Sequence, residues 1–134
     1  MTITLWCLVA VVLMPVALAM IGTIAKVKQL GSIDNNYPRQ RYDDCTGLPV
    51  RLLSAQQNAW EAVIMFAVAV LVTHIAGVTA GATDNLALAF VGSRVAHTLC
   101  YALNLGTLRT LSFFAATGCI LWMFKLAAAA GGVA

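Results

Sequence analysis

Long apolar runs dominate this chain and limit the folds that it can adopt. The first covers residues 2–25 and as a helix would be about 36 Å long, more than the roughly 30 Å hydrocarbon core of a bilayer. Similar runs cover about residues 52–75, 85–104 and 107–127. Backbone in lipid must satisfy its hydrogen bonds internally, which helices do. The sequence therefore predicts an all-α membrane protein built as a bundle of four transmembrane helices.

Composition agrees with this prediction and excludes other classes. Hydrophobic residues make up 61% of the chain and charged residues only 10%, which is too apolar for a soluble domain. The net charge of +3 is small and scattered, so we expect no nucleic-acid partner. The four cysteines show no spacing typical of metal ligands, and we predict no metal site. At 134 residues, we expect a single domain over 1–134.

The segment 26–51 between the first two runs sets the predicted orientation. No basic residue precedes the first run, so we expect a retained helix rather than a signal peptide. The positive-inside rule places this segment in the cytoplasm and both termini on the non-cytoplasmic side. A connection of this length is often a functional cover. Its basic residues are Lys26, Lys28, Arg39, Arg41 and Arg51.

The third run carries polar side chains along one helix face. Arg94, His97 and Tyr101 follow the spacing i, i+3, i+7. An arginine in mid-membrane costs roughly 2.5–3.5 kcal/mol on insertion scales, so it must face protein or water. This face is therefore a predicted site.

The second run has a matching stripe that contains Asn58 and Glu61, with Gln57 beside it. Counted inward at 1.5 Å per residue, Glu61 and Arg94 both lie about 15 Å deep. We therefore predict a Glu61–Arg94 ion pair, with Asn58 level with His97. The connection 77–84 is expected to be a turn in which Thr83 or Asp84 caps the third helix.

The start of the fourth run adds Arg109 and Thr110, with Ser112 nearby. A helix N-terminus carries a partial positive charge and unpaired N–H groups, so it favours an anion such as a thiolate, phosphate or carboxylate. Each polar residue also has a structural explanation. The Glu61–Arg94 pair could serve packing alone, and Arg109 could be an interfacial side chain. The three matched elements together favour a polar pocket.

Three segments resemble the family of membrane-associated proteins in eicosanoid and glutathione metabolism, known as MAPEG. They are residues 92–98 (Gly-Ser-Arg-Val-Ala-His-Thr) with Tyr101, residues 108–110 (Leu-Arg-Thr) and residues 58–61 (Asn-Ala-Trp-Glu). The resemblance covers nearly the whole chain. The chain is similar to the prostaglandin-forming members in its motifs and to the compact bacterial members in its size. For a bacterial chain, it implies the inner membrane.

The resemblance implies a homotrimer that binds glutathione between neighbouring subunits near the cytoplasmic side. The family's prostaglandin-forming members carry arginines at the positions of Ser54 and Gln57, where they hold the glutathione carboxylates. Arg51, one turn earlier, could compensate in part. Phe113 replaces a tyrosine, and the segment from Tyr101 to Arg109 is one residue shorter. The implied cofactor-binding positions are Gln57, Asn58, Glu61, Arg94, His97 and Tyr101. Arg109 is implied to stabilise the glutathione thiolate, with Thr110 at the position of an adjacent hydroxyl.

Three functions remain in contention. The leading one is a glutathione-dependent transferase or peroxidase that acts on lipophilic electrophiles drawn from the bilayer by thiolate activation. The alternative is a non-catalytic lipid-binding or scaffold protein of the same fold, because fold does not decide function. A small transporter or channel subunit would explain the buried charges but not the position of Arg109.

Overall fold

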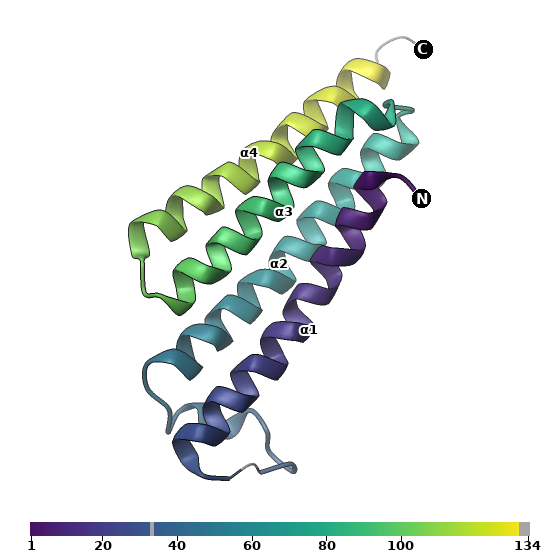
Figure 1. Cartoon of the computed structure of the whole chain (residues 1–134). Helices are drawn as coiled ribbons and strands as arrows, with labels where there is room; N and C mark the ends of the chain where they lie inside the picture. Colours follow the sequence, from purple (N-terminus) through teal and green to yellow (C-terminus); the bar gives the residue numbers. More distant parts are fainter. Residues whose placement is uncertain (33, 132–134) are drawn as a thin grey trace.

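The computed structural model describes residues 1–32 and 34–131, and in it four long helices run alternately up and down (Figure 1). Both termini lie at one end of the bundle, and the α1–α2 and α3–α4 connections lie at the other. This arrangement brings Arg109, at the start of α4, to the same end as the basic first loop. The elements are α1 (Ile3–Leu30), a short 3₁₀ helix η1 (Gln40–Tyr42), α2 (Leu48–Ile75), α3 (Ala80–Ala102) and α4 (Gly106–Gly131).

Three of the four helices, α1, α2 and α4, are long and apolar enough to cross a membrane. The expectation of four spans is therefore confirmed only in part, because α3 does not reach that hydropathy. Asp84, Arg94 and His97 lower it. These side chains are compatible with the bundle because α3 packs against the three other helices. The chain is thus a multi-pass integral membrane protein.

Small residues on α2 allow the helices to approach closely. Ala55, Ala59, Ala62 and Ala69 are all buried, and their steps of four, three and seven residues place them on one face. The side chain of Phe66 lies on the same face and stacks on Phe90 of α3, with ring centroids 4.2 Å apart. This stack belongs to an apolar core to which all four helices contribute.

Several helix boundaries differ from the sequence prediction. The first helix continues five residues beyond Ala25, and α2 begins at Leu48 because a proline in its first turn needs no N–H partner. Gly31 ends α1 at a φ of 74°, which glycine adopts without strain. The predicted turn 77–84 is wrong in its second half, since α3 already begins at Ala80.

The predicted cap of α3 by Thr83 or Asp84 is also wrong. The cap residue is Thr79, and its side chain makes no capping hydrogen bond. Asp84 instead accepts hydrogen bonds from the backbone N–H of Thr4 at 3.0 Å and from the Thr4 hydroxyl at 2.8 Å. Its carboxylate therefore satisfies an unpaired donor in the first turn of α1, a role that spacing along α3 could not reveal.

The first loop folds back on the end of α1. Lys26 is only 2% exposed; its ammonium donates to the carbonyl of Pro38 and lies 4.6 Å from the centroid of the Tyr42 ring. Cys45, next to this contact in the sequence, is buried. The loop is thus docked against the end of α1.

Candidate functional site

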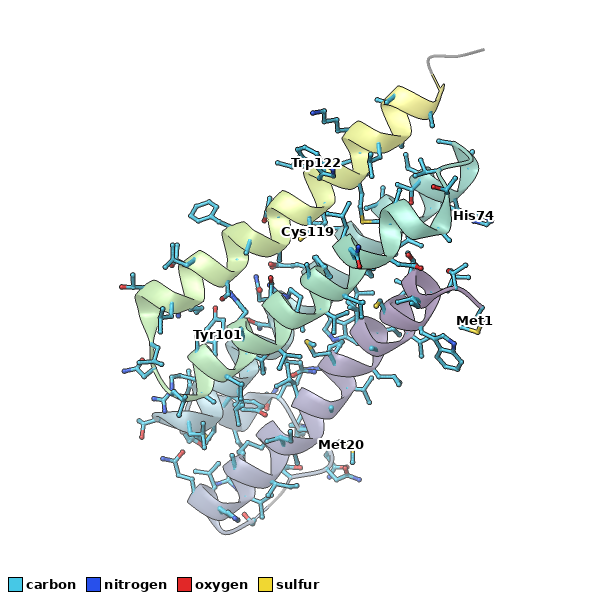
Figure 2. The ribbon with its side chains drawn as sticks, turned by 45° about the horizontal axis from the view of Figure 1, so that its top comes forward. Met1, Met20, His74, Tyr101, Cys119 and Trp122 are labelled. Carbon is cyan, nitrogen blue, oxygen red and sulfur yellow. The ribbon has the colours of Figure 1, made fainter. Side chains whose placement is uncertain are left out.

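The polar side chains predicted from the sequence gather in the half of the bundle that contains the loops. They come from α2, α3 and the start of α4. Tyr101 marks this half in Figure 2, whereas Met1 and His74 mark the opposite end. The α3–α4 turn that positions Arg109 depends on Asn104, which has a φ of 59°, a left-handed conformation that asparagine tolerates.

Arg94 is 2% exposed and is held by Asn58. One guanidinium nitrogen, Nη2, donates to Asn58 Oδ1 at 2.6 Å and to the Asn58 carbonyl at 3.4 Å. The amide of Asn58 donates in turn to Glu61 Oε2 at 3.1 Å. The predicted direct Glu61–Arg94 ion pair is therefore wrong: within the described residues, the two charges are joined through the amide between them. The stripes do meet, but Arg94 rather than His97 faces Asn58.

Glu61 lies close to the midpoint of α2, and its side chain is exposed on the single chain. Gln57, one turn earlier, is also exposed. A carboxylate in the middle of an apolar helix is costly in contact with lipid. This face of α2 therefore needs protein, water or a ligand outside the single chain.

His97 is 4% exposed and connects α3 to the first turn of α4. Its Nδ1 lies 2.9 Å from the carbonyl oxygen of Arg109 and 3.4 Å from the hydroxyl of Ser112. The Ser112 hydroxyl donates to the same carbonyl at 2.8 Å. His97, Ser112 and the Arg109 carbonyl thus form one hydrogen-bonded cluster that fixes the start of α4.

The Arg109 side chain lies over Tyr101, with its guanidinium carbon 4.6 Å from the ring centroid. Tyr101 in turn meets the His97 ring edge-on, with centroids 5.2 Å apart. Arg109 is half-buried, and no carboxylate of the described residues lies within 4 Å of it. The cation is therefore held by an aromatic face and stays available to an anion.

Three other positions make contacts that the sequence did not indicate. The Arg51 guanidinium donates to the carbonyl of Ala102 at 3.1 Å, so it caps the C-terminus of α3. The Thr110 hydroxyl is exposed and donates to the carbonyl of Gly106 in its own helix at 3.2 Å. Adjacent residues on a helix do not share a face, which separates Thr110 from the Arg109 cluster. Phe113 lies against His97, with ring centroids 6.3 Å apart.

A pocket of about 120 Å³ opens beside the Arg94–Asn58–Glu61 relay, between α2, α3 and α4. Asn58, Glu61, Arg94 and Thr117 form its polar part. The remaining wall is apolar and was not predicted, because aromatic and aliphatic residues at core spacing carry no signal of their own. These lining residues are Ala62, Met65, Phe90, Phe113, Ala116 and Ile120.

A family model for the MAPEG family matches residues 3–129, nearly the whole chain. The chain belongs to the MAPEG family. This match confirms the resemblance drawn from the sequence. MAPEG proteins are membrane proteins of glutathione-related or eicosanoid metabolism. The comparisons with curated proteins and with solved structures returned no match, so the family alone guides the assignment of a more specific activity.

Proposed function

We propose that this protein is a glutathione-dependent membrane transferase or peroxidase for lipophilic electrophiles, and that it acts as a homotrimer. The observation that carries the proposal is the position of Arg109. Its guanidinium lies in the first turn of α4 over the Tyr101 ring, with no carboxylate of the described residues beside it. Guanidinium and helix N-terminus together favour an anion, and a thiolate is the reactive anion of glutathione.

The chemistry then follows from thiolate stabilisation. Arg109 favours the ionised sulfur, which raises the nucleophile's concentration at neutral pH. In a transfer reaction, the sulfur forms a bond to an electrophilic carbon while the leaving group departs with its electron pair. The pocket beside Arg94 supplies apolar walls for a lipophilic reactant. Asn58, Glu61, Arg94, His97 and Tyr101 offer both donors and acceptors to a peptide-like thiol.

The exposed face of α2 supports assembly into a trimer. Glu61 and Gln57 lie near the middle of a membrane-spanning helix but outside the single chain's core. A neighbouring subunit, with glutathione bound between subunits, would shield both from lipid.

The decisive experiment compares Arg109→Gln with the unmodified protein in detergent or liposomes. Conjugation of glutathione to chlorodinitrobenzene should fall about 10²-fold or more, the usual loss of one electrostatic stabiliser. Glutathione binding measured by calorimetry should change much less. Lys125→Gln is the matched control, because Lys125 is a cation over Trp122 on the opposite half of α4. Equal conjugation rates for Arg109→Gln and the unmodified protein would remove Arg109 from the mechanism.

The apolar pocket also fits a second function, a lipid-binding or scaffold protein without catalysis. Met65, Phe90 and Ile120 could contact an acyl chain as well as an electrophile. This alternative predicts no saturable glutathione binding and no conjugation by the unmodified protein, whereas a fatty acid or phospholipid would still bind.

A further inference from the structure

A groove runs along α1 from its loop end towards the middle of the helix. Its wide section, about 480 Å³, lies between the end of α1 and the start of α2. Its narrow section, about 180 Å³, lies between α1 and α3, which are neighbours in Figure 1. Ile21 lines both sections, so they adjoin. Neither section shares a lining residue with the pocket beside Arg94.

The narrow section is apolar. Its walls come from α1, with Met14 and Ala17, and from α3, with Leu99. The hydroxyl of Thr98 also lines it, and this hydroxyl donates to the sulfur of Met14 at 3.9 Å. A surface of this kind suits a hydrocarbon chain, which needs no hydrogen bonds.

The wide section changes from apolar to polar towards the loop. Ile24 and Leu52 line its apolar part, whereas Lys28, Gln29 and Thr46 line the part nearest the loop. Lys28 is exposed, and no carboxylate of the described residues lies within 4 Å of its ammonium. The groove as a whole is therefore apolar inside the bundle and cationic at its loop end, which is the complement of an anionic amphiphile.

The polar rim of the groove presents hydrogen-bond donors. The Gln29 amide donates to the Thr46 hydroxyl at 3.1 Å, and its carbonyl oxygen accepts from the Thr46 backbone N–H at 3.2 Å. The second N–H of Gln29 and the hydroxyl proton of Thr46 stay free to donate, since neither has a partner among the described residues. Together with the Lys28 ammonium, they form a set of donors that suits a phosphate group.

The length of the groove agrees with one lipid in one leaflet. Lys28 and Met14 are fourteen residues apart, which is about 21 Å along a helix axis. Half of the hydrocarbon core of a bilayer is about 15 Å thick. A molecule with its phosphate at Lys28 can therefore lay one acyl chain along Ile24 and Ile21 and into the narrow section. Free inorganic phosphate would leave both apolar parts of the groove uncovered.

We propose that this groove binds an anionic phospholipid from the leaflet at the loop end of the bundle. Its phosphate lies at Lys28, Gln29 and Thr46, and one acyl chain lies along α1. A choline or ethanolamine headgroup would bring a second cation close to Lys28, so a headgroup without a cation is preferred. Because Gln29 and Thr46 flank the first loop, the lipid stabilises the docked loop. The site is separate from the proposed thiol site and does not rest on the proposed function.

The first test measures headgroup preference by native mass spectrometry of the detergent-purified protein. Phosphatidylglycerol and phosphatidylcholine with the same acyl chains are added in equal amounts, and we expect phosphatidylglycerol to be retained in excess. Lys28→Gln should lower this preference about fivefold, equivalent to about 1 kcal/mol for one cation near a membrane surface. Lys125→Gln, which removes a cation from the opposite half of α4, should not. No preference in the unmodified protein, or an unchanged preference in Lys28→Gln, would overturn the proposal.

The second test places the phosphate. Thr46→Val removes a donor and should weaken the retention of both lipids, because both carry a phosphate diester. Thr46→Ser keeps the hydroxyl and should retain both lipids as the unmodified protein does. Circular dichroism and the oligomeric state of each variant control for misfolding. Equal retention by the two variants would contradict the position assigned to the phosphate.

The third test asks what covers the apolar part of the groove. Ala17→Phe should fill the narrow section and lower the retention of phosphatidylglycerol. Val16→Phe is the matched control, because Val16 is exposed and adjacent residues of a helix do not share a face. If Ala17→Phe instead breaks the oligomer and leaves lipid retention unchanged, a second subunit covers the groove. That result, or equal lipid retention by the two variants, would overturn the proposal.

Discussion

The Oδ1 atom of Asn58 lies 2.6 Å from a guanidinium nitrogen of Arg94. The Asn58 amide thus accepts the hydrogen bond that the Glu61 carboxylate was expected to accept. The Glu61 carboxylate instead accepts from the Asn58 amide and lies on the exposed face of α2. Direct pairing of two buried charges often repays only part of their desolvation. With Asn58 between them, Nη2 of Arg94 has its acceptor inside the bundle, while Glu61 stays available to a ligand or a second subunit.

Removal of this amide should destabilise the protein. Asn58→Leu leaves the buried Arg94 Nη2 without its acceptor side chain, and a hydrogen bond to a charged group contributes about 1.5–3 kcal/mol. The free energy of unfolding can be measured by denaturant titration of circular dichroism in detergent. Gln57→Leu is the matched control, because it removes a neighbouring amide that is exposed. Equal stability of the two variants would show that Asn58 does not hold Arg94.

Loss of the Ser112 hydroxyl should affect catalysis more than stability. Ser112→Ala removes one of the groups that hold the His97 ring and the first turn of α4. We expect a several-fold decrease in kcat/KM for conjugation, with a small change in Tm. Thr73→Val removes a buried hydroxyl at the opposite end of the bundle and should leave kcat/KM unchanged. A Ser112→Ala protein as active as wild type would remove Ser112 from the positioning of Arg109.

The carboxylate of Asp84 should stabilise α1 from a distance. Asp84→Ala removes both hydrogen bonds to Thr4, and loss of a comparable cap costs about 0.5–2 kcal/mol. The expected result is a lower midpoint of unfolding. Asp44→Ala provides the contrast, because Asp44 makes only a surface ion pair with Arg41 at 3.7 Å, of a kind that contributes little. An equal effect of the two substitutions would contradict the cap.

The docked loop should loosen at high pH. Burial raises the pKa of Tyr42 above its ordinary value of 10.0, and the nearby Cys45 adds to the effect. The folded loop therefore favours the neutral phenol. Its contribution to stability is present below pH 10 and is lost as the pH rises through the raised pKa. Ultraviolet titration of tyrosinate, taken as the difference between wild type and Tyr42→Phe, measures that pKa. A Tyr42 transition at or below pH 10 would contradict the docking.

Periodicity and hydropathy were enough to predict the four helices, because lipid leaves few alternatives for an apolar backbone. The site residues on α2 and α3 were predicted from their shared faces and similar depth. The prediction of the Glu61–Arg94 pair was wrong because counting residues gives only the depth of each Cα along its helix axis. It does not report the direction of a long side chain, and the Arg94 side chain reaches Asn58 instead.

Other features depend on contacts that no local pattern contains. Asp84 looks like a cap for its own helix, yet it serves α1, eighty residues away in sequence. From the sequence, Arg51 was a candidate to bind a carboxylate of the ligand. In the structure its guanidinium donates to the carbonyl of Ala102, at the C-terminus of α3. Ser112 was visible only as a neighbour of Arg109, since its importance comes from His97 on the preceding helix. These are tertiary contacts, and sequence spacing within one helix cannot report them.

The bond between Thr4 and Asp84 also has a consequence for biosynthesis. The start of the first helix emerges from the ribosome long before the residue that completes its first turn. The α1–α2 hairpin therefore enters the membrane with an unfinished end. Its first turn gains these hydrogen bonds only when α3 arrives, so this end of α1 is completed late, by a contact eighty residues apart in sequence.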